Sequence, residues 1–341
     1  MEFFYVLEIV GGRGVHHNVR VNLETQVLVI TRSEDLLKLR ALAKLCSKEF
    51  FDDPSLLVVA WRRILEVLEL AMPPVAEKKI RGKKKKQQRK KNDPRKLEVL
   101  DTCHALGRTC GFVGDFDDAR RYYKRAKEGY EEQLGRDSEM ALGVTSGLIM
   151  ATDDDGRIIE KLRYSLKRCE RALGEENVVT LDTLNQLGNK LDESREYEEA
   201  IRVHERCLAG RTNVLGEDHK DMLGSLNNLG VVYGKLRNYK KTMEYFERAL
   251  KGLERMLGKK YPSTLDRVFN IAIVYDNGFE DYGKAEELYE RALEGYEQFG
   301  KDHKRTKNCA EPFALCLKFN GNSERLTQLI SSYPCLNENE E

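Results

Sequence analysis

A 42-residue periodicity between Thr180 and Thr306 constrains the fold of this chain more than any other feature of its sequence. The blocks TLDTLNQLG, MLGSLNNLG and TLDRVFNIA begin at residues 180, 222 and 264. Each unit ends on a Leu-Gly or Phe-Gly pair, and these glycines lie at 174, 216, 258 and 300. Because one such unit cannot bury its apolar face alone, self-similarity at this period predicts a stacked helical array.

Each unit has the pattern of two helices. Leu184, Leu187 and Leu191 fall on one stripe at helical spacing, and the next two units repeat it. A small residue follows beside the stripe at Gly188, Gly230 and Ala272, where the partner helix is expected to approach closely. The second helices begin near 195, 237 and 280, so one residue is inserted before Tyr282. They alternate large and small residues at their crossing points, as close packing requires.

These motifs resemble tetratricopeptide repeats. The eight extra residues per unit, together with L-N-N-L-G and R-A-L-x-G-x-E-x-x-L-G, are similar to the kinesin light chain-like type. The resemblance runs from about residue 97 to about 329. It implies an all-α, right-handed superhelix (an α-solenoid) over 93–332 and a protein-binding function. The expected units are about 93–137, 138–177, 178–219, 220–261 and 262–304, with a cap at 305–332.

The residues outside the array have a different character. Residues 1–77 are expected to form a small N-terminal extension, with either short strands or a poorly ordered leader in 1–32 and a helical hairpin at 33–72 that Pro73-Pro74 ends. A hairpin of this length is too short for the heptad coiled coil that precedes the repeats of kinesin light chains, so coupling to a motor is not supported. Residues 78–92 are a basic linker, and 333–341 are an acidic tail.

The basic linker allows three interpretations. Its residues 78–91 contain ten Lys or Arg in fourteen positions. Such a run repels itself and stays extended, so it can be a plain linker. It can also be a nuclear localisation signal, or a contact with RNA or phospholipid. No aromatic residue lies between the charges, which argues against a base-stacking surface.

The second unit is the least regular. It spans 39 residues between its closing glycines, Gly135 and Gly174. Counting 42 back from the third unit places Ser146 where the small glycine is expected and Ile158 where an alanine is expected. The acidic turn 153–156 lacks the twelve-residue ligand pattern of a calcium loop, so a solvated turn is predicted.

Composition and motifs do not indicate chemistry. The sequence has no phosphate-binding loop, nucleophile elbow or paired metal ligands. We therefore expect no enzyme activity, no cofactor, no metal and no small-molecule substrate, and we expect His204 to be a satisfied core histidine. A net charge of +1 and eight scattered cysteines suit a protein of the cytoplasm, with the basic run as a candidate nuclear signal. Residues 1–12 lack the basic region of a secretory signal, and no stretch is long and apolar enough to span a membrane.

The face opposite the leucine stripe is the candidate site. Amides offer donors and acceptors that can bracket a peptide backbone, and apolar residues among them can form a floor. An alternative remains open, in which these amides bond the neighbouring helix and stiffen the stack. A second function, association with nucleic acid through 78–91, also remains open. The candidate peptide-binding residues are Asn185, Gln186, Asn189, Asn227, Asn228, Val231, Lys235, Phe269, Asn270 and Ile273.

Overall fold

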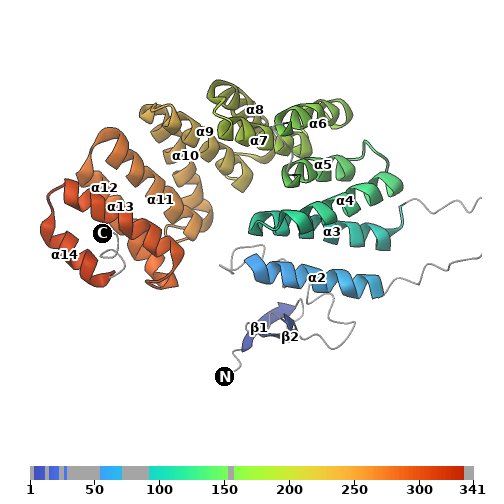
Figure 1. The fold of residues 1–341 in the computed structure, drawn as a ribbon, viewed down its shortest axis with the longest axis horizontal. Helices are drawn as coiled ribbons and strands as arrows, with labels where there is room; N and C mark the ends of the chain where they lie inside the picture. The colour runs from blue at the N-terminus through green and yellow to red at the C-terminus, as the bar shows by residue number, and fades with distance from the viewer. Residues whose placement is uncertain are drawn as a thin grey trace, which may run out of the picture. The chain divides into compact units, whose positions relative to one another are not determined.

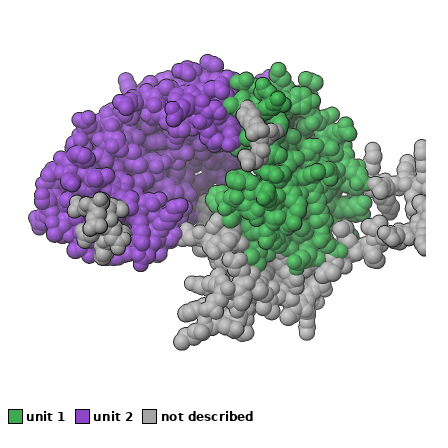
Figure 2. Space-filling view, in the orientation of Figure 1, with its two compact units in different colours: residues 1–174 green, residues 175–341 purple. Residues whose placement is uncertain are grey.

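The computed structural model describes residues 4–11, 15–22, 27–28, 54–70, 92–152 and 157–333. The chain divides into two compact units, residues 1–174 and 175–341 (Figure 2). Four predicted features lie outside the described residues: the first helix of the N-terminal hairpin, the basic run 78–91, the acidic turn 153–156 and the tail from 334 onward. The right-handed superhelix predicted for 93–332, and the division into domains, stay predictions.

The N-terminal extension of unit 1 contains strands and one described helix (Figure 1). The strands form an antiparallel sheet in the order β1-β2-β3, and Phe4 of β1 lies opposite Asn22 of β2. Helix α2 places Ile64, Leu65 and Leu68 in the same core as α3 and α4, so it is packed as part of unit 1. The bounds are Phe4–Gly11 for β1, Val15–Asn22 for β2, Val27–Leu28 for β3 and Pro54–Leu70 for α2.

The rest of the described chain consists of six consecutive helix pairs, which confirms the all-α prediction for the repeats (Figure 1). Residues 92–152 and 157–333 contain no strand. In unit 1 the pairs are α3 (Pro94–Val113) with α4 (Phe116–Gln133), and α5 (Glu139–Ala151) with α6 (Ile158–Leu173). In unit 2 they are α7 (Val178–Glu193) with α8 (Tyr197–Leu215), α9 (Lys220–Lys235) with α10 (Tyr239–Leu257), α11 (Pro262–Val274) with α12 (Tyr282–Tyr296), and α13 (Lys304–Phe319) with α14 (Ser323–Ser332).

The small residues of the first helices lie where an aromatic side chain of the second helix crosses, as expected. A Cβ added at Gly230 would lie 2.4 Å from the ring of Phe246. A Cβ at Gly188 would lie 2.6 Å from the ring of His204, and the first repeat of unit 1 shows the same contact. Real Cβ atoms do not approach neighbours this closely, so only glycine permits this helix spacing.

A second row of glycines, in the second helices, was not predicted. Each of these glycines receives a leucine from the first helix of its own pair, and an added Cβ would lie 2.2 to 2.4 Å from that leucine. In the pairs α3–α4, α7–α8 and α9–α10 the two helices therefore meet at two glycines, one on each helix, whereas α11 has Ala272 in place of the first glycine. The pairs are Gly129 with Leu100, Gly210 with Leu181, Gly252 with Leu223, and Gly295 with Leu265.

The closing glycines take a backbone conformation that other residues rarely adopt. Gly174, Gly216, Gly258 and Gly300 have φ between 82° and 99°. In each case the glycine follows the second helix, and this left-handed region carries no Cβ penalty for glycine. The regular recurrence of these glycines therefore has a conformational cause.

The structure locates the inserted residue of the fifth unit. Helix α11 continues into a π-helix, η2 (Tyr275–Phe279), which accommodates one residue more than an α-helical end would. The following turn residue, Glu280, has φ of 54°, as do its counterparts Arg237 (56°) and Arg195 (64°). Past α12, the 3₁₀ helix η3 (Glu297–Phe299) is wound more tightly and leads to Gly300, which keeps the 42-residue spacing.

The register predicted for the second unit was wrong in its first helix. The N-cap residues Ser138 and Asn177 are 39 residues apart, whereas the later N-caps are 42 apart. Counted from the caps, Ile149 and not Ser146 takes the position of Gly188. A spacing of 42 residues back from the third unit is valid only for the second helix, α6, whose C-cap is Gly174. At this spacing Arg168 takes the position that Gly210 has in α8.

Candidate functional site

The ten candidate residues lie on the first helices of three consecutive pairs in unit 2. Nine of them are half-buried, and Lys235 is exposed. Hydrogen bonds join α7 to α9 and α9 to α11 across this face. The residues are Asn185, Gln186 and Asn189 on α7; Asn227, Asn228, Val231 and Lys235 on α9; and Phe269, Asn270 and Ile273 on α11. We call them the amide face.

Three amides of this face bond one another. The Nδ2 of Asn228 donates to the Oδ1 of Asn185 at 3.0 Å and to the Oδ1 of Asn189 at 3.1 Å. These bonds join two neighbouring repeats, so part of the amide face has the structural role that was left open as an alternative. These two bonds use both amide protons of Asn228. Among the described residues, the carbonyl oxygen of Asn228 and the NH₂ groups of Asn185 and Asn189 have no hydrogen-bond partner.

A buried arginine occupies the step from α9 to α11. The Nη1 of Arg267 donates to the Oδ1 of Asn227, and its guanidinium lies 5.1 Å from the centroid of the Phe246 ring. Burial lowers the pKa of Arg267 to about 10, although the carboxylate of Asp266 opposes this shift. The Nε of Arg267 has no hydrogen-bond partner. Asn227 is thus committed to holding a buried cation.

Two amides of the face are not committed in this way. The Oε1 of Gln186 is buried without a hydrogen-bond partner. Asn270 makes no side-chain hydrogen bond to any described residue. An unsatisfied buried polar group costs about 1–3 kcal/mol, and this cost applies to the Gln186 oxygen. The half-buried Asn270 amide can bond a ligand.

The apolar residues of the face are partly covered by the core. The ring of Phe269 lies 5.8 Å from that of Tyr289, centroid to centroid, and Ile273 packs on the same cluster. Val231 lies against the neighbouring cluster around Phe246. These side chains therefore form a shallow floor, and Phe269 is anchored inward.

The charges of the face cancel. Lys235 on α9 donates to both carboxylate oxygens of Asp192 on α7, at 2.7 and 2.8 Å. Lys190 is bonded to Glu193 at 2.6 Å. The face thus offers amides and apolar surface with little net charge to attract an ion.

A recurring polar tie between the helices of a pair was not predicted from the sequence. The Tyr130 hydroxyl donates to Asp101, and the Tyr296 hydroxyl donates to Asp266 at 2.6 Å. Arg211 takes the same position and donates to Asp182 at 2.7 Å. The signal was present in the sequence as a spacing of 29 or 30 residues. The two other full repeats lack both members of the tie, with Gly224 and Leu253 in one and Gly143 and Cys169 in the other.

His204 is a core histidine, but it is not satisfied as predicted. It is fully buried against Gly188, and neither ring nitrogen has a hydrogen-bond partner. Burial lowers the pKa of His204 to about 4, and nearby Asp192 opposes the shift. The ring is therefore neutral at pH 7 and takes the place that Phe246 takes in the next repeat.

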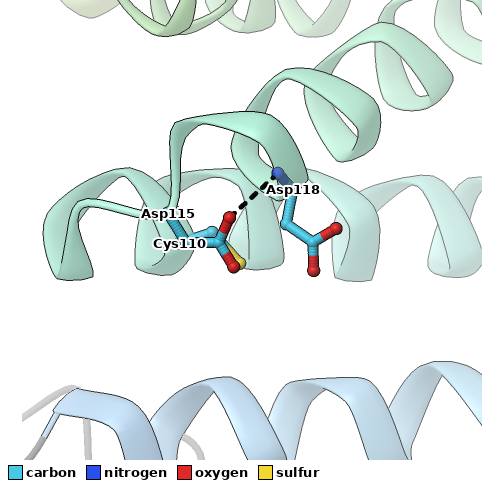
Figure 3. Close-up of side chains that lie close together, drawn as sticks. All are labelled: Cys110, Asp115 and Asp118. Carbon is cyan, nitrogen blue, oxygen red and sulfur yellow. Dashed lines mark hydrogen bonds between the residues drawn. The ribbon is translucent and has the colours of Figure 1, made fainter.

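One group of potential metal ligands occurs in the described residues, at the start of α4 (Figure 3). Cys110, Asp115 and Asp118 lie together, and the backbone N–H of Asp118 donates to the Oδ1 of Asp115 at 3.1 Å. This bond is an N-cap of α4. Arg62 of α2 forms an ion pair with both carboxylates, and burial raises the pKa of the Cys110 thiol. The cluster therefore ties α2 to α4, and we assign no metal to it.

Comparison with known proteins agrees with the repeat pattern. A tetratricopeptide repeat family matches residues 193–255 and 221–298, and a second tetratricopeptide repeat family matches residues 99–139. Residues 99–139 and 193–298 are tetratricopeptide repeats. None of the curated proteins matches this repeat protein in sequence.

The solved structures that resemble the repeat protein have low sequence identity to it. BtubC (BKLC) from P. vanneervenii is 22% identical, with a TM-score of 0.55, over 74% of this chain and 94% of that one. NprR in complex with its cognate peptide NprX is 16% identical, with a TM-score of 0.51, over 89% and 78% of the two chains. The repeats of a putative kinesin light chain from Podosopora anserina are 16% identical, with a TM-score of 0.48, over 72% and 99%.

The described helices of the repeat protein include none that could cross a bilayer, because none is both long and apolar enough. The six cysteines among these residues are buried free thiols. Cys207, for example, donates to the backbone oxygen of Leu181 at 3.3 Å. These six cysteines therefore serve as small core residues, as expected.

Proposed function

We propose that the protein is a noncatalytic interaction scaffold, and that the amide face of unit 2 binds a peptide segment of a partner protein. The observation that supports this most directly is the half-buried Asn270 amide, which makes no side-chain hydrogen bond to any described residue. A peptide backbone supplies both donors and acceptors at regular spacing, and it would satisfy such groups. The NH₂ groups of Asn185 and Asn189 add donors for backbone carbonyls.

The structural neighbours support this proposal at the level of the fold. NprR has this fold and is seen with its cognate peptide. Tetratricopeptide repeats in general bind proteins or peptides without catalysis. The neutral charge of the amide face indicates that its ligand need not be strongly charged.

The proposal predicts that a bulky side chain at Asn270 weakens peptide binding. Asn270→Arg places a long side chain on the face without removing an internal hydrogen bond. Peptides selected from a random display library on the full chain should lose about tenfold or more in affinity for this variant, which corresponds to about 1.4 kcal/mol. Fluorescence anisotropy with individual labelled peptides measures the change.

The matched control is Asn213→Arg, the same substitution on α8, where Asn213 is exposed. It should bind the selected peptides within about twofold of the wild type, since rim and distant residues contribute little. Equal loss in both variants, or equal affinity in both, would place the binding surface elsewhere. Affinity that falls steeply with added salt would instead favour phosphate contacts and the alternative function in nucleic-acid association.

We further propose that the protein acts in the cytoplasm, and that the basic run 78–91 directs any fraction of the protein that enters the nucleus. A fluorescent protein fused to 78–91 should accumulate in nuclei if the run is a localisation signal. The same fusion with the ten basic residues replaced by Gln is the control. Uniform distribution of both fusions would leave the run as a plain linker.

A further inference from the structure

A cleft opens in unit 1 between α5 and α6, far along the chain from the amide face. Its volume is about 310 Å³. Thr145 and Ile149 of α5 form one wall, and Tyr164, Ser165 and Arg168 of α6 form the other, with Glu160 and Lys161 at one end. All of these residues belong to unit 1.

The cleft has a cause in the sequence. The pairs α3–α4, α7–α8 and α9–α10 have a glycine on each helix at these two points, but α5 and α6 have Ile149 and Arg168 there. A side chain at each of these points holds the helices apart, because a Cβ alone would already collide at the usual spacing. Thr145 takes the position of Leu184 in α7 and Leu226 in α9, whose larger side chains fill the space between the helices of those pairs. The smaller threonine leaves this space empty between α5 and α6.

The walls restrict the chemistry of a ligand. The charged groups are balanced, since Arg168 pairs with Asp137 at 2.7 Å and Glu160 lies next to Lys161. An ionic ligand would therefore bring an unpaired charge. An aromatic ring on the ligand suits these walls, because both cations and aromatic rings stack on π-systems. The walls offer the cations of Lys161 and Arg168 and the exposed ring of Tyr164.

Two hydroxyls add a polar requirement. Thr145 donates its proton to the backbone oxygen of Ala141 at 2.8 Å, which leaves its oxygen lone pairs to accept. The Oγ of Ser165 is buried without a partner. A hydroxyl on the ligand could donate to Thr145, so an uncharged ring with one donor matches the walls better than a bare hydrocarbon.

We propose that this cleft binds a single uncharged phenol ring, supplied either by a tyrosine side chain of a partner or by a free small molecule. A volume near 300 Å³ lies at the lower end of ligand sites, which suits one ring. The site is independent of the peptide function proposed for unit 2.

The test uses the full chain and p-cresol as the probe, with toluene and cyclohexanol as controls that lack the hydroxyl and the aromatic ring. Saturation-transfer NMR should show p-cresol binding more tightly than either control, by about threefold or more. Thr145→Leu installs the leucine that α7 and α9 carry at this position, and it should weaken p-cresol binding by about tenfold while raising the melting temperature, since it fills the gap.

A second variant guards against misfolding of the first. Tyr164 is mostly exposed, so Tyr164→Ala should stay folded and lose p-cresol affinity by about threefold or more. N-acetyl-tyrosine amide separates the two sources: affinity at least equal to that of p-cresol indicates a tyrosine side chain, and weaker affinity indicates a free phenol. Absence of p-cresol binding at millimolar concentration, or binding unchanged in both variants, would overturn the proposal.

Discussion

Replacing Gly230 by leucine should lower the free energy of unfolding by about 3 kcal/mol or more, the largest stability change that we expect from a single substitution in unit 2. The first atom of the new side chain would already lie 2.4 Å from the Phe246 ring. Phe246 is buried against Ile271 and Val274, so it cannot move aside without opening the core. Urea denaturation followed by circular dichroism measures the change.

Gly224 provides a matched control on the same helix. An added Cβ there meets nothing within 4 Å. Gly224→Ala should therefore stabilise the protein by about 0.5–1 kcal/mol, because alanine is the better helix former, whereas Gly230→Ala should destabilise it. Phe246→Leu should reduce the cost of Gly230→Ala in a double-mutant cycle. Equal effects of alanine at 224 and 230 would contradict the tight crossing.

His204→Phe should remove a large acid sensitivity. The folded pKa of His204 is about 4, against 6.5 in the unfolded chain, so the unfolded state binds the proton first as pH falls. The contribution of His204 to the free energy of unfolding should therefore be constant above pH 6.5 and should decrease as the pH falls from 6.5 to 4. Relative to pH 7.5, the loss should be about 2 kcal/mol at pH 5 and about 3 kcal/mol once the pH is below 4. Phenylalanine at this position does not titrate, and Phe246 shows that the site accommodates it.

The measurement compares wild type and His204→Phe in urea at pH 7.5 and pH 5. His104 remains in both proteins, and burial also lowers its pKa to about 4, so both retain that contribution. The difference between the two proteins isolates His204. A difference in stability that is the same at both pH values would mean that the ring is charged or hydrated in the folded state.

The architecture of the repeats was predictable because it depends on periodic features. Leucine stripes, the small residues at 188, 230 and 272, and the closing glycines recur at a fixed spacing, and each has a direct steric reason. The error at Ser146 shows the limit of counting. In a unit that is three residues shorter, the missing residues can lie before the first helix or after its start. Only the position of the N-cap residue Ser138 shows which of the two is the case.

The candidate site was predictable as a face but not in its bonding. The helical spacing places Asn185, Asn189 and Asn228 on one side, but it does not state which amide of one repeat reaches the next. That depends on the offset between α7 and α9, which lets Asn228 bond two partners. We consequently expect Asn228→Ala to cost about 1 kcal/mol.

The π-helix η2 protects the phase of the array. An extra residue rotates each later side chain of the same helix by about 100° and can turn a buried face toward solvent. Here the extra residue at η2 is cancelled within the same repeat by the tighter turn of η3, so α13 begins 42 residues after α11. The repeat thus contains both the insertion and its compensation, one before and one after α12, and the last pair of helices keeps the 42-residue spacing.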